Sequence, residues 1–335
     1  MDINIISTES LGTRGMCCSV KAGKRCILID PGIALGYLRG GLLPHPFQVA
    51  IGALIREKII CACSNATDIV FSHYHGDHIP LYNANPYQLS LERVREILPQ
   101  KRLWGLNPEN VSETMQLRAQ AIGGYLGFKI PAAEGVHDGE LCFSQAMPHG
   151  ELGKNRNRVM MTRIDADGCV FVHASDIQLT ERFPVSQILE WKPDIAFASG
   201  PPLYLNRMSP ASRKNARENT LILSDRVDTL IIDHHVLRSK DSIAWFNDIR
   251  KTAKNRILCA ADFMKKKRCF LEAQRPALYK DMPVPEDWHE NHAQGNAEFS
   301  GYLVWRNRDI SHEVVKMFKN GQDHPNPPLK PGVAN

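Results

Sequence analysis

Short apolar runs separated by turn residues dominate the first half of the chain. The segments 3–7, 16–21 and 26–30 are apolar or alternating, and the last of them ends at Pro31-Gly32. Runs of this length bounded by turn residues predict β-strands. The same pattern predicts further strands at 68–72, near Leu103, and at 140–147, 159–164 and 168–174.

Helical spacing of apolar residues becomes more frequent in the second half. Helices are predicted at 46–62, 89–98, 112–126 and 262–280, and another begins at Ser209-Pro210, a typical helix start, and runs to about residue 225. Strands are predicted at 194–198 and 229–233, and 288–296 is predicted to be a loop. Two sheets packed face to face with helices outside, an αββα four-layer sandwich of the α+β class, would accommodate both halves.

No linker divides the chain, so we expect one main domain over residues 1–260. Residues 261–320 are predicted to form a C-terminal helical extension of that domain. Residues 321–335 are rich in proline and are predicted to be a disordered tail.

Composition supports a globular protein that does not cross a membrane. Apolar residues make up 43% and charged residues 23% of the 335 positions. No apolar run reaches 18 residues, and the N-terminus lacks the pattern of a secretory signal, so a cytoplasmic location is expected. The nine cysteines form no C-x-x-C pair, and we expect them to be small core residues kept reduced.

The net charge of +5 is mild, but two groups of basic residues have alternative interpretations. The run Lys265 to Arg268 is either a solvated helix face or a contact for a polyanion. The second group is either a solvated hairpin turn or a set of phosphate contacts; it comprises Lys154, Arg156 and Arg158.

The chemistry of the chain is concentrated in one segment, His73-Tyr74-His75-Gly76-Asp77-His78. It directly follows a predicted buried strand, and residues two apart in an extended chain point to one side. Gly76 favours a turn, and Asp77 and His78 are expected to lie in that turn. Imidazole and carboxylate ligands suit zinc, and also manganese or iron. The segment therefore predicts a site for two neighbouring metal ions.

This segment resembles the H-x-H-x-D-H motif of the metallo-β-lactamase superfamily. Further motifs occur in the family's order over residues 3–260. Asp30 in ILIDPG precedes the segment, and it is followed by His149 in AMPHG, Asp176 in VFVHASD and the histidines of TLIIDHH. The whole pattern is similar to a largely archaeal branch of predicted metallo-hydrolases with no proven substrate.

The resemblance implies a role for each motif residue. One metal would be held by His73, His75 and His149, and the other by Asp77, His78 and His234, with Asp176 between the two. His235 is the alternative to His234, which is preferred because it directly follows the strand. Asp30 would orient the cluster without binding metal. His173 is expected to be a packing or surface residue.

The resemblance also implies the chemistry. Two divalent ions, zinc by expectation, lower the pKa of a shared water toward about 7, and the resulting hydroxide attacks the substrate. Asp77 would orient that hydroxide, and Arg238 follows the last histidine at a spacing similar to that of phosphodiesterase members.

The preferred substrate is a phosphodiester, in RNA, DNA or a nucleotide, so nucleic acid is among the candidate partners. A thioester, lactone or amide hydrolase is the alternative enzyme. A redox di-iron protein of the superfamily would carry a flavin module, of which the sequence gives no sign. The non-enzymatic alternative is a metal-containing binding module. No membrane partner is expected, and the sequence makes no prediction of the oligomeric state.

Overall fold

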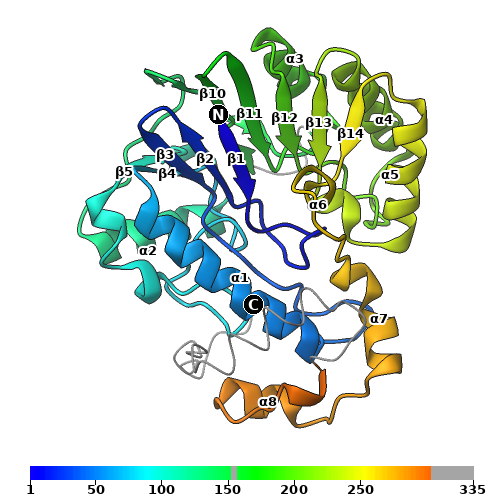
Figure 1. Cartoon of the computed structure of the whole chain (residues 1–335). Helices are drawn as coiled ribbons and strands as arrows, with labels where there is room; N and C mark the ends of the chain where they lie inside the picture. The colour runs from blue at the N-terminus through cyan, green and yellow to red at the C-terminus, as the bar shows by residue number, and fades with distance from the viewer. Residues whose placement is uncertain (152–156, 303–335) are drawn as a thin grey trace.

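Two mixed β-sheets lie face to face, with helices on their outer sides (Figure 1). The computed structural model describes residues 1–151 and 157–302. This arrangement confirms the predicted αββα sandwich. Among the described residues, no helix has both the length and the apolar character needed to cross a membrane.

The first sheet has five strands in sequence order: β1 (Asp2–Ile5), β2 (Cys18–Ala22), β3 (Arg25–Ile29), β4 (Asp68–Phe71) and β5 (Arg102–Gly105). The β1–β2 and β2–β3 pairs are antiparallel, whereas β3, β4 and β5 run parallel. Helix α1 (Pro46–Asn65) makes the crossover from β3 to β4 and packs against β3, and α2 (Glu113–Leu126) follows β5. The carboxyl ends of β3 and β4 therefore meet at one edge of the sheet.

The second sheet has seven strands in a different order. Its strands run β14 (Arg256–Leu258), β13 (Thr229–Ile232), β12 (Ile195–Ala198), β11 (Cys169–Ser175), β10 (Thr162–Ala166), β7 (Leu141–Phe143) and β6 (His137–Asp138). Strands β11 to β14 are parallel and are joined through α3 (Arg182–Glu190), α4 (Pro210–Ser224) and α5 (Lys240–Thr252). The parallel strands again bring their carboxyl ends to one edge.

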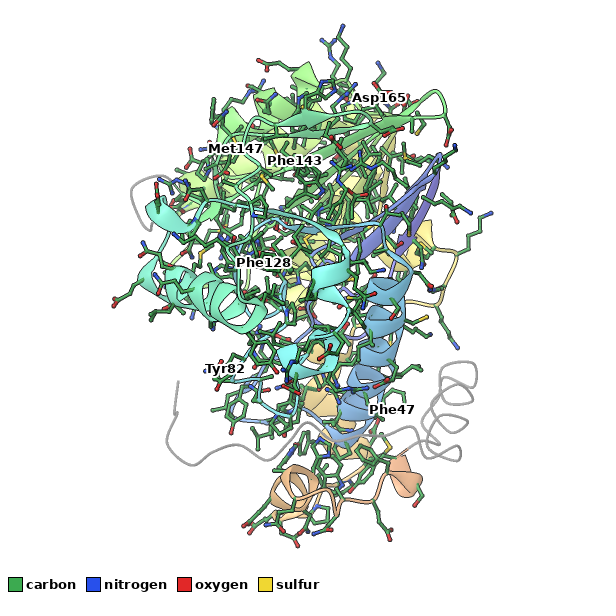
Figure 2. The ribbon with its side chains drawn as sticks, turned by 90° about the vertical axis from the view of Figure 1, so that its left-hand side faces the viewer. Phe47, Tyr82, Phe128, Phe143, Met147 and Asp165 are labelled. Atoms are coloured by element: carbon green, nitrogen blue, oxygen red, sulfur yellow. The ribbon has the colours of Figure 1, made fainter. Side chains whose placement is uncertain are left out.

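Apolar side chains of both sheets form one continuous core. Strands β4 and β13 are buried at every position, as their apolar sequences predict. Figure 2 shows Phe143 and Met147 among closely packed side chains, and both are at most 2% exposed, whereas Tyr82 lies at the surface. The core fixes the two sheets relative to each other. It therefore also fixes the positions of the residues at the ends of their strands.

Several element predictions need correction. The predicted helix 89–98 is two short 3-10 helices, η1 (Leu91–Val94) and η2 (Leu98–Gln100), because Pro99 cannot continue a helix from the preceding turn. The predicted strand 140–147 is divided into β7 and β8 (Met147–Pro148). The predicted strand 159–164 is divided between β9 (Arg158–Val159), which pairs with β8, and β10.

The C-terminal part also differs from prediction. The expected helix 262–280 is broken into α6 (Ala260–Phe263) and α7 (Leu271–Asp281), since Lys265 adopts a positive φ of 53° and Cys269 pairs with Leu11 instead. The predicted loop 288–296 contains α8 (Trp288–Ala293), which Trp288 anchors to a small apolar cluster with Val49 and Tyr87. Figure 1 shows α7 and α8 beside the lower end of α1. The predicted tail, residues 321–335, lies outside the described residues.

Candidate metal centre

The predicted ligands meet where strands of both sheets end. His73 to His78 follow β4, Asp176 follows β11 and His234 lies one residue beyond Asp233 at the end of β13. His149 directly follows β8. Because these ends lie at one edge of the sandwich, residues from distant parts of the sequence form a single buried cluster.

One ligand group consists of three imidazoles around one carboxylate oxygen. From Asp176 Oδ2, the distances are 3.0 Å to His149 Nε2, 3.4 Å to His73 Nε2 and 3.7 Å to His75 Nδ1. His73 Nε2 and His75 Nδ1 are themselves 3.0 Å apart. These four residues could hold one metal ion, since their ligand atoms all lie within 4.8 Å of one another.

A second group faces the other oxygen of Asp176. From Oδ1, His78 Nε2 lies at 3.3 Å and His234 Nε2 at 3.5 Å. Asp77 Oδ2 is 3.4 Å from His234 Nε2 and completes the group. Asp176 thus presents one carboxylate oxygen to each group, an arrangement in which one carboxylate can be shared by two metal ions.

The two adjacent histidines His234 and His235 face different groups. The His235 Nε2 atom is 3.5 Å from Asp176 Oδ2, on the side of His149, and its ring stacks on His234 with centroids 4.6 Å apart. Of the two, His234 is the one that approaches Asp77. The geometry therefore favours His234 in the second group and gives His235 a place near the first.

Unsatisfied polar atoms show that the cluster fits a cation. His78 Nε2 and Asp176 Oδ1 are both buried, and neither has a hydrogen-bond partner among the described residues. Leaving buried polar groups unpaired is costly in free energy, and a metal ion between a nitrogen and a carboxylate oxygen would satisfy both. Nitrogen and oxygen donors suit zinc, manganese or iron.

Asp30 lies beside the cluster and orients it. Its carboxylate accepts hydrogen bonds from His78 Nδ1 (2.9 Å), from the Ser72 backbone N–H (2.9 Å) and from the hydroxyls of Ser72 (2.8 Å) and Ser175 (2.6 Å). Burial acts to raise the pKa of Asp30, but the hydrogen bond from His78 and its charge lower that pKa to about 2. An ionised Asp30 holds the proton of His78 on Nδ1 and leaves Nε2 free for metal.

The backbone is strained at the ends of the strands that carry the site. Asp30, Ser175 and His234 have φ values of 51°, 49° and 88°, a region that residues other than glycine rarely adopt. Such residues persist where surrounding contacts fix them, and they cluster at functional sites. Gly32 adds a close approach, since a Cβ there would lie 2.2 Å from the carbonyl carbon of His78.

Asp233 is a supporting residue that the sequence analysis missed. Its Oδ1 accepts from Thr8 Oγ1 (2.9 Å), Ser10 N (3.1 Å) and His234 N (2.7 Å), and its Oδ2 accepts from Ala260 N (2.9 Å). It thereby ties the N-terminal loop and α6 to the residue that carries the last imidazole. The signal was present in the sequence, because Asp233 directly precedes His234 at a strand end.

Arg238 lies against the second group, as its spacing suggested. Its Nη2 is 3.5 Å from Asp77 Oδ2, its Nε donates to Glu9 Oε1 (2.7 Å) and its Nη1 donates to the Tyr204 hydroxyl (3.0 Å). The Arg238 side chain is 6% exposed. Glu9 and Tyr204 were not predicted, and no local spacing relates either of them to Arg238.

The structure also places the remaining predicted residues. His173 is fully buried and donates from Nε2 to the Met16 carbonyl (2.9 Å), so it is a packing residue. The run Lys265 to Arg268 is not a helix face but a connection between α6 and α7, in which Arg268 pairs with Asp262 at 2.7 Å. Lys154 and Arg156 lie outside the described residues.

The cysteine prediction is confirmed only in part. All nine cysteines are unpaired, and five are buried. Cys61 is exposed, because it occupies the outward side of α1 near the end of that helix. The other three are partly buried.

The chain is similar in sequence to known proteins over most of its length. No family model matches it. A UPF0282 protein of Methanosarcina mazei is 47% identical over 304 residues, covering 91% of this chain and all of the relative. A UPF0282 protein of Pyrococcus abyssi is 34% identical over 290 residues, covering 84% of this chain and 93% of the relative.

Solved structures similar to this one share little of its sequence. An isothiocyanate hydrolase from Delia radicum gut bacteria has a TM-score of 0.48 and 15% identity, over 74% of this chain and 94% of that one. The metallo-β-lactamase fold protein YhfI of Bacillus subtilis has a TM-score of 0.45 and 12% identity, over 79% of this chain and 97% of that one.

Proposed function

The chain belongs to the UPF0282 family and has the metallo-β-lactamase fold, and on this premise we propose that it is a metal-dependent hydrolase of phosphodiesters. The observation that carries the proposal is Asp176, whose two carboxylate oxygens face two separate groups of ligand atoms. A structural zinc site is usually closed by four ligands around one ion, which does not account for two adjacent groups.

The proposed ligands are those grouped around Asp176. His73, His75 and His149 would hold one divalent ion, and Asp77, His78 and His234 the other, with Asp176 shared. Zinc is the proposed metal, with manganese or iron as alternatives. Ions held there would supply Lewis acidity and would lower the pKa of bound water toward neutrality.

Other residues of the chain complete the proposed chemistry. The Asp77 side chain is 19% exposed, so it can face both the metal centre and the substrate, and it would orient the attacking water. Arg238 would stabilise negative charge on the substrate oxygens, since its guanidinium lies beside Asp77. The unpaired cysteines support a reducing, cytoplasmic setting for this activity.

Positive charge next to the ligands favours a phosphodiester over a neutral carbonyl substrate. Arg238 and two further arginines, Arg14 and Arg39, lie in one connected ion-pair network beside Asp77. A thioester, lactone or amide carries no charge at the scissile group, so nearby arginines would stabilise its binding less. Carbonyl hydrolysis is therefore the second candidate, and a binding module without turnover is the third.

The proposal is tested by metal content together with hydrolysis of bis(p-nitrophenyl) phosphate. We expect about two divalent ions per wild-type chain, about one or fewer in Asp176→Asn, and a fall of at least about 100-fold in kcat for Asp77→Asn. Asp165→Asn, which alters a half-exposed carboxylate far from the ligands, is the matched control and should keep both metal and rate.

Three results would contradict the proposal. Failure to bind metal after reconstitution with zinc, manganese and iron would exclude the ligand assignment. Turnover of a thioester or lactone without any phosphodiester turnover would favour the second candidate, and two bound ions without turnover of either class would favour the binding module.

A further inference from the structure

Two arginines near the metal centre share a single carboxylate. Arg14 donates from Nε and Nη2 to the two oxygens of Glu272, both at 2.6 Å. Arg39 donates from Nε and Nη2 to Glu272 Oε1, at 2.9 and 2.5 Å. The side chains come from the loop after β1, the loop after β3 and helix α7. Two guanidinium groups on one carboxylate leave one positive charge in excess.

The rest of the network does not remove that excess. Arg238 is paired with Glu9, whose Oε1 lies 3.9 Å from Arg14 Nε. Three arginines are therefore in contact with two glutamates. Asp77 also lies beside Arg238, but as a proposed metal ligand its charge would be balanced by the metal ion.

A fourth arginine lies nearby, and no carboxylate among the described residues pairs with it. Arg275 is fully buried and donates to Gln48 Oε1 and to the carbonyl oxygens of Tyr37 and Leu42. Its Nη2 is buried without a hydrogen-bond partner among the described residues. Uncompensated buried cations are costly in free energy, so a bound anion would stabilise this group of arginines.

Part of this group of arginines remains open to a ligand. The side chains of Arg14 and Arg39 are 22% and 26% exposed. Each uses Nε and Nη2 on Glu272, and the Nη1 group of each has no partner among the described residues. Gly36 lies directly against the Arg14 side chain, since a Cβ at Gly36 would be 2.2 Å from Arg14 Nη2. The loop that carries Arg39 is thus held close to Arg14.

Tyr204 connects this pair of arginines to the metal centre. The Arg39 guanidinium lies over the Tyr204 ring at 4.5 Å from its centroid. The hydroxyl of the same ring accepts from Arg238, which in turn lies beside Asp77. An anionic group bound at Arg14 and Arg39 would therefore lie a short distance beyond a phosphoester bound at the metal centre.

We propose that Arg14 and Arg39, with the Tyr204 ring as one wall, form a second anion-binding subsite for the substrate. The inference rests on the proposed function and makes it more specific. The substrate is a phosphodiester that carries a further phosphate or carboxylate beyond the bond that is cleaved. Arg39 is the principal determinant of this specificity, since it is the more exposed of the two arginines.

The test compares two non-hydrolysable probes that differ in one anionic group. Propylphosphonate carries a phosphonate alone, whereas 3-phosphonopropionate carries a carboxylate at the other end of a chain of similar length. We expect the zinc-loaded wild type to bind 3-phosphonopropionate at least about tenfold more tightly in isothermal titration calorimetry. In Arg39→Gln the two dissociation constants should agree within about twofold.

Two further variants complete the design. Tyr204→Phe keeps the ring but removes the hydroxyl that holds Arg238, and it should retain part of the preference. Arg95→Gln removes an exposed guanidinium distant from the four arginines and should retain the full preference for 3-phosphonopropionate. Thermal unfolding of each variant establishes that it is folded before titration.

The subsite is overturned if the wild type binds the two probes equally, if it binds neither, or if Arg39→Gln keeps the preference. Its failure can be told apart from failure of the proposed function. Hydrolysis of bis(p-nitrophenyl) phosphate with equal probe affinities would remove only the subsite. A preserved preference in a protein without phosphodiesterase activity would remove only the proposed reaction.

Discussion

The side chains that support the cluster matter as much as those that face it. Asp30 and Asp233 each follow a strand and accept at least four hydrogen bonds, so each fixes the geometry of a neighbouring histidine. Ser72 and Ser175 add hydroxyls that donate to Asp30. Orientation of the imidazoles thus depends on residues that touch no metal.

Replacing Asp233 by asparagine tests this dependence. All four groups around the carboxylate donate to it, so an amide nitrogen would face a donor whichever way it is turned. We expect Asp233→Asn to lower the free energy of unfolding by about 2–3 kcal/mol. Urea denaturation measures the change, with Asp165→Asn as the surface control. A change below about 0.5 kcal/mol would show that the loop and α6 are held by other contacts.

The cluster could be predicted from the sequence at this scale because its ligands follow apolar strands at short, recognisable spacings. His73 to His78 form one segment, and the structure brings that segment together with His149, Asp176 and His234. The arginine network could not be predicted in the same way. Arg14 and Glu272 lie 258 positions apart in the sequence and meet only because α7 packs near the first loop.

Within the first sheet, three neighbouring strands are joined by one buried carboxylate. Asp68 on β4 accepts from Arg25 on β3 (2.5 and 3.1 Å) and from Trp104 Nε1 on β5 (3.0 Å). Burial acts to raise the pKa of Asp68, but the hydrogen bonds from Arg25, Thr67 and Trp104 lower it below its usual value. The ion pair therefore contributes stability that depends on pH.

Stability from Asp68 should be lost in acid. Because the folded-state pKa is lowered, the contribution is complete above the unfolded-state pKa of about 3.9 and disappears as the pH falls below it. We expect Asp68→Asn to lower the free energy of unfolding by about 2–3 kcal/mol at pH 7, and we expect this gap between variant and wild type to narrow as the pH falls below about 4. Denaturation at several pH values measures this gap. A gap independent of pH would assign the loss to packing instead.

Elements with strong end signals were predicted well, and those fixed by tertiary contacts were not. Helix α4 begins at Pro210 with Ser209 as its N-cap, whose hydroxyl accepts from the Ser212 backbone N–H. In contrast, α8 has no capping hydrogen bond from its N-cap side chain. It is stabilised through Trp288, whose burial depends on residues far away in sequence, so its local pattern resembles a loop.

At the scale of the whole molecule, the proposed metal ligands join the two sheets. They are five buried or partly buried imidazoles and two carboxylates, brought from both sheets to one place. Without cations, the acidic groups rely on these imidazoles for compensation. Ions that bind only the folded chain should therefore stabilise the contact between the sheets.

Removal of metal should lower the melting temperature. A ligand present at 100 times its Kd stabilises a protein by about 2.7 kcal/mol, which for a chain of this length predicts a fall in melting temperature of roughly 4 °C for each ion removed by a chelator. Differential scanning fluorimetry measures the fall, and added zinc should reverse it. The Asp176→Asn variant should respond much less. An unchanged wild-type melting temperature, with metal loss verified by elemental analysis, would contradict a stabilising role.

The division of the ligands between the two halves of the chain bears on how the protein is made. Synthesis from the N-terminus releases the segment from His73 to His78 long before His149, Asp176 and His234 leave the ribosome. For that interval the nascent chain would carry four of the seven proposed ligands without the other three. Because His234 follows β13, the complete ligand set would form only once β13 has joined its sheet and the two sheets have associated.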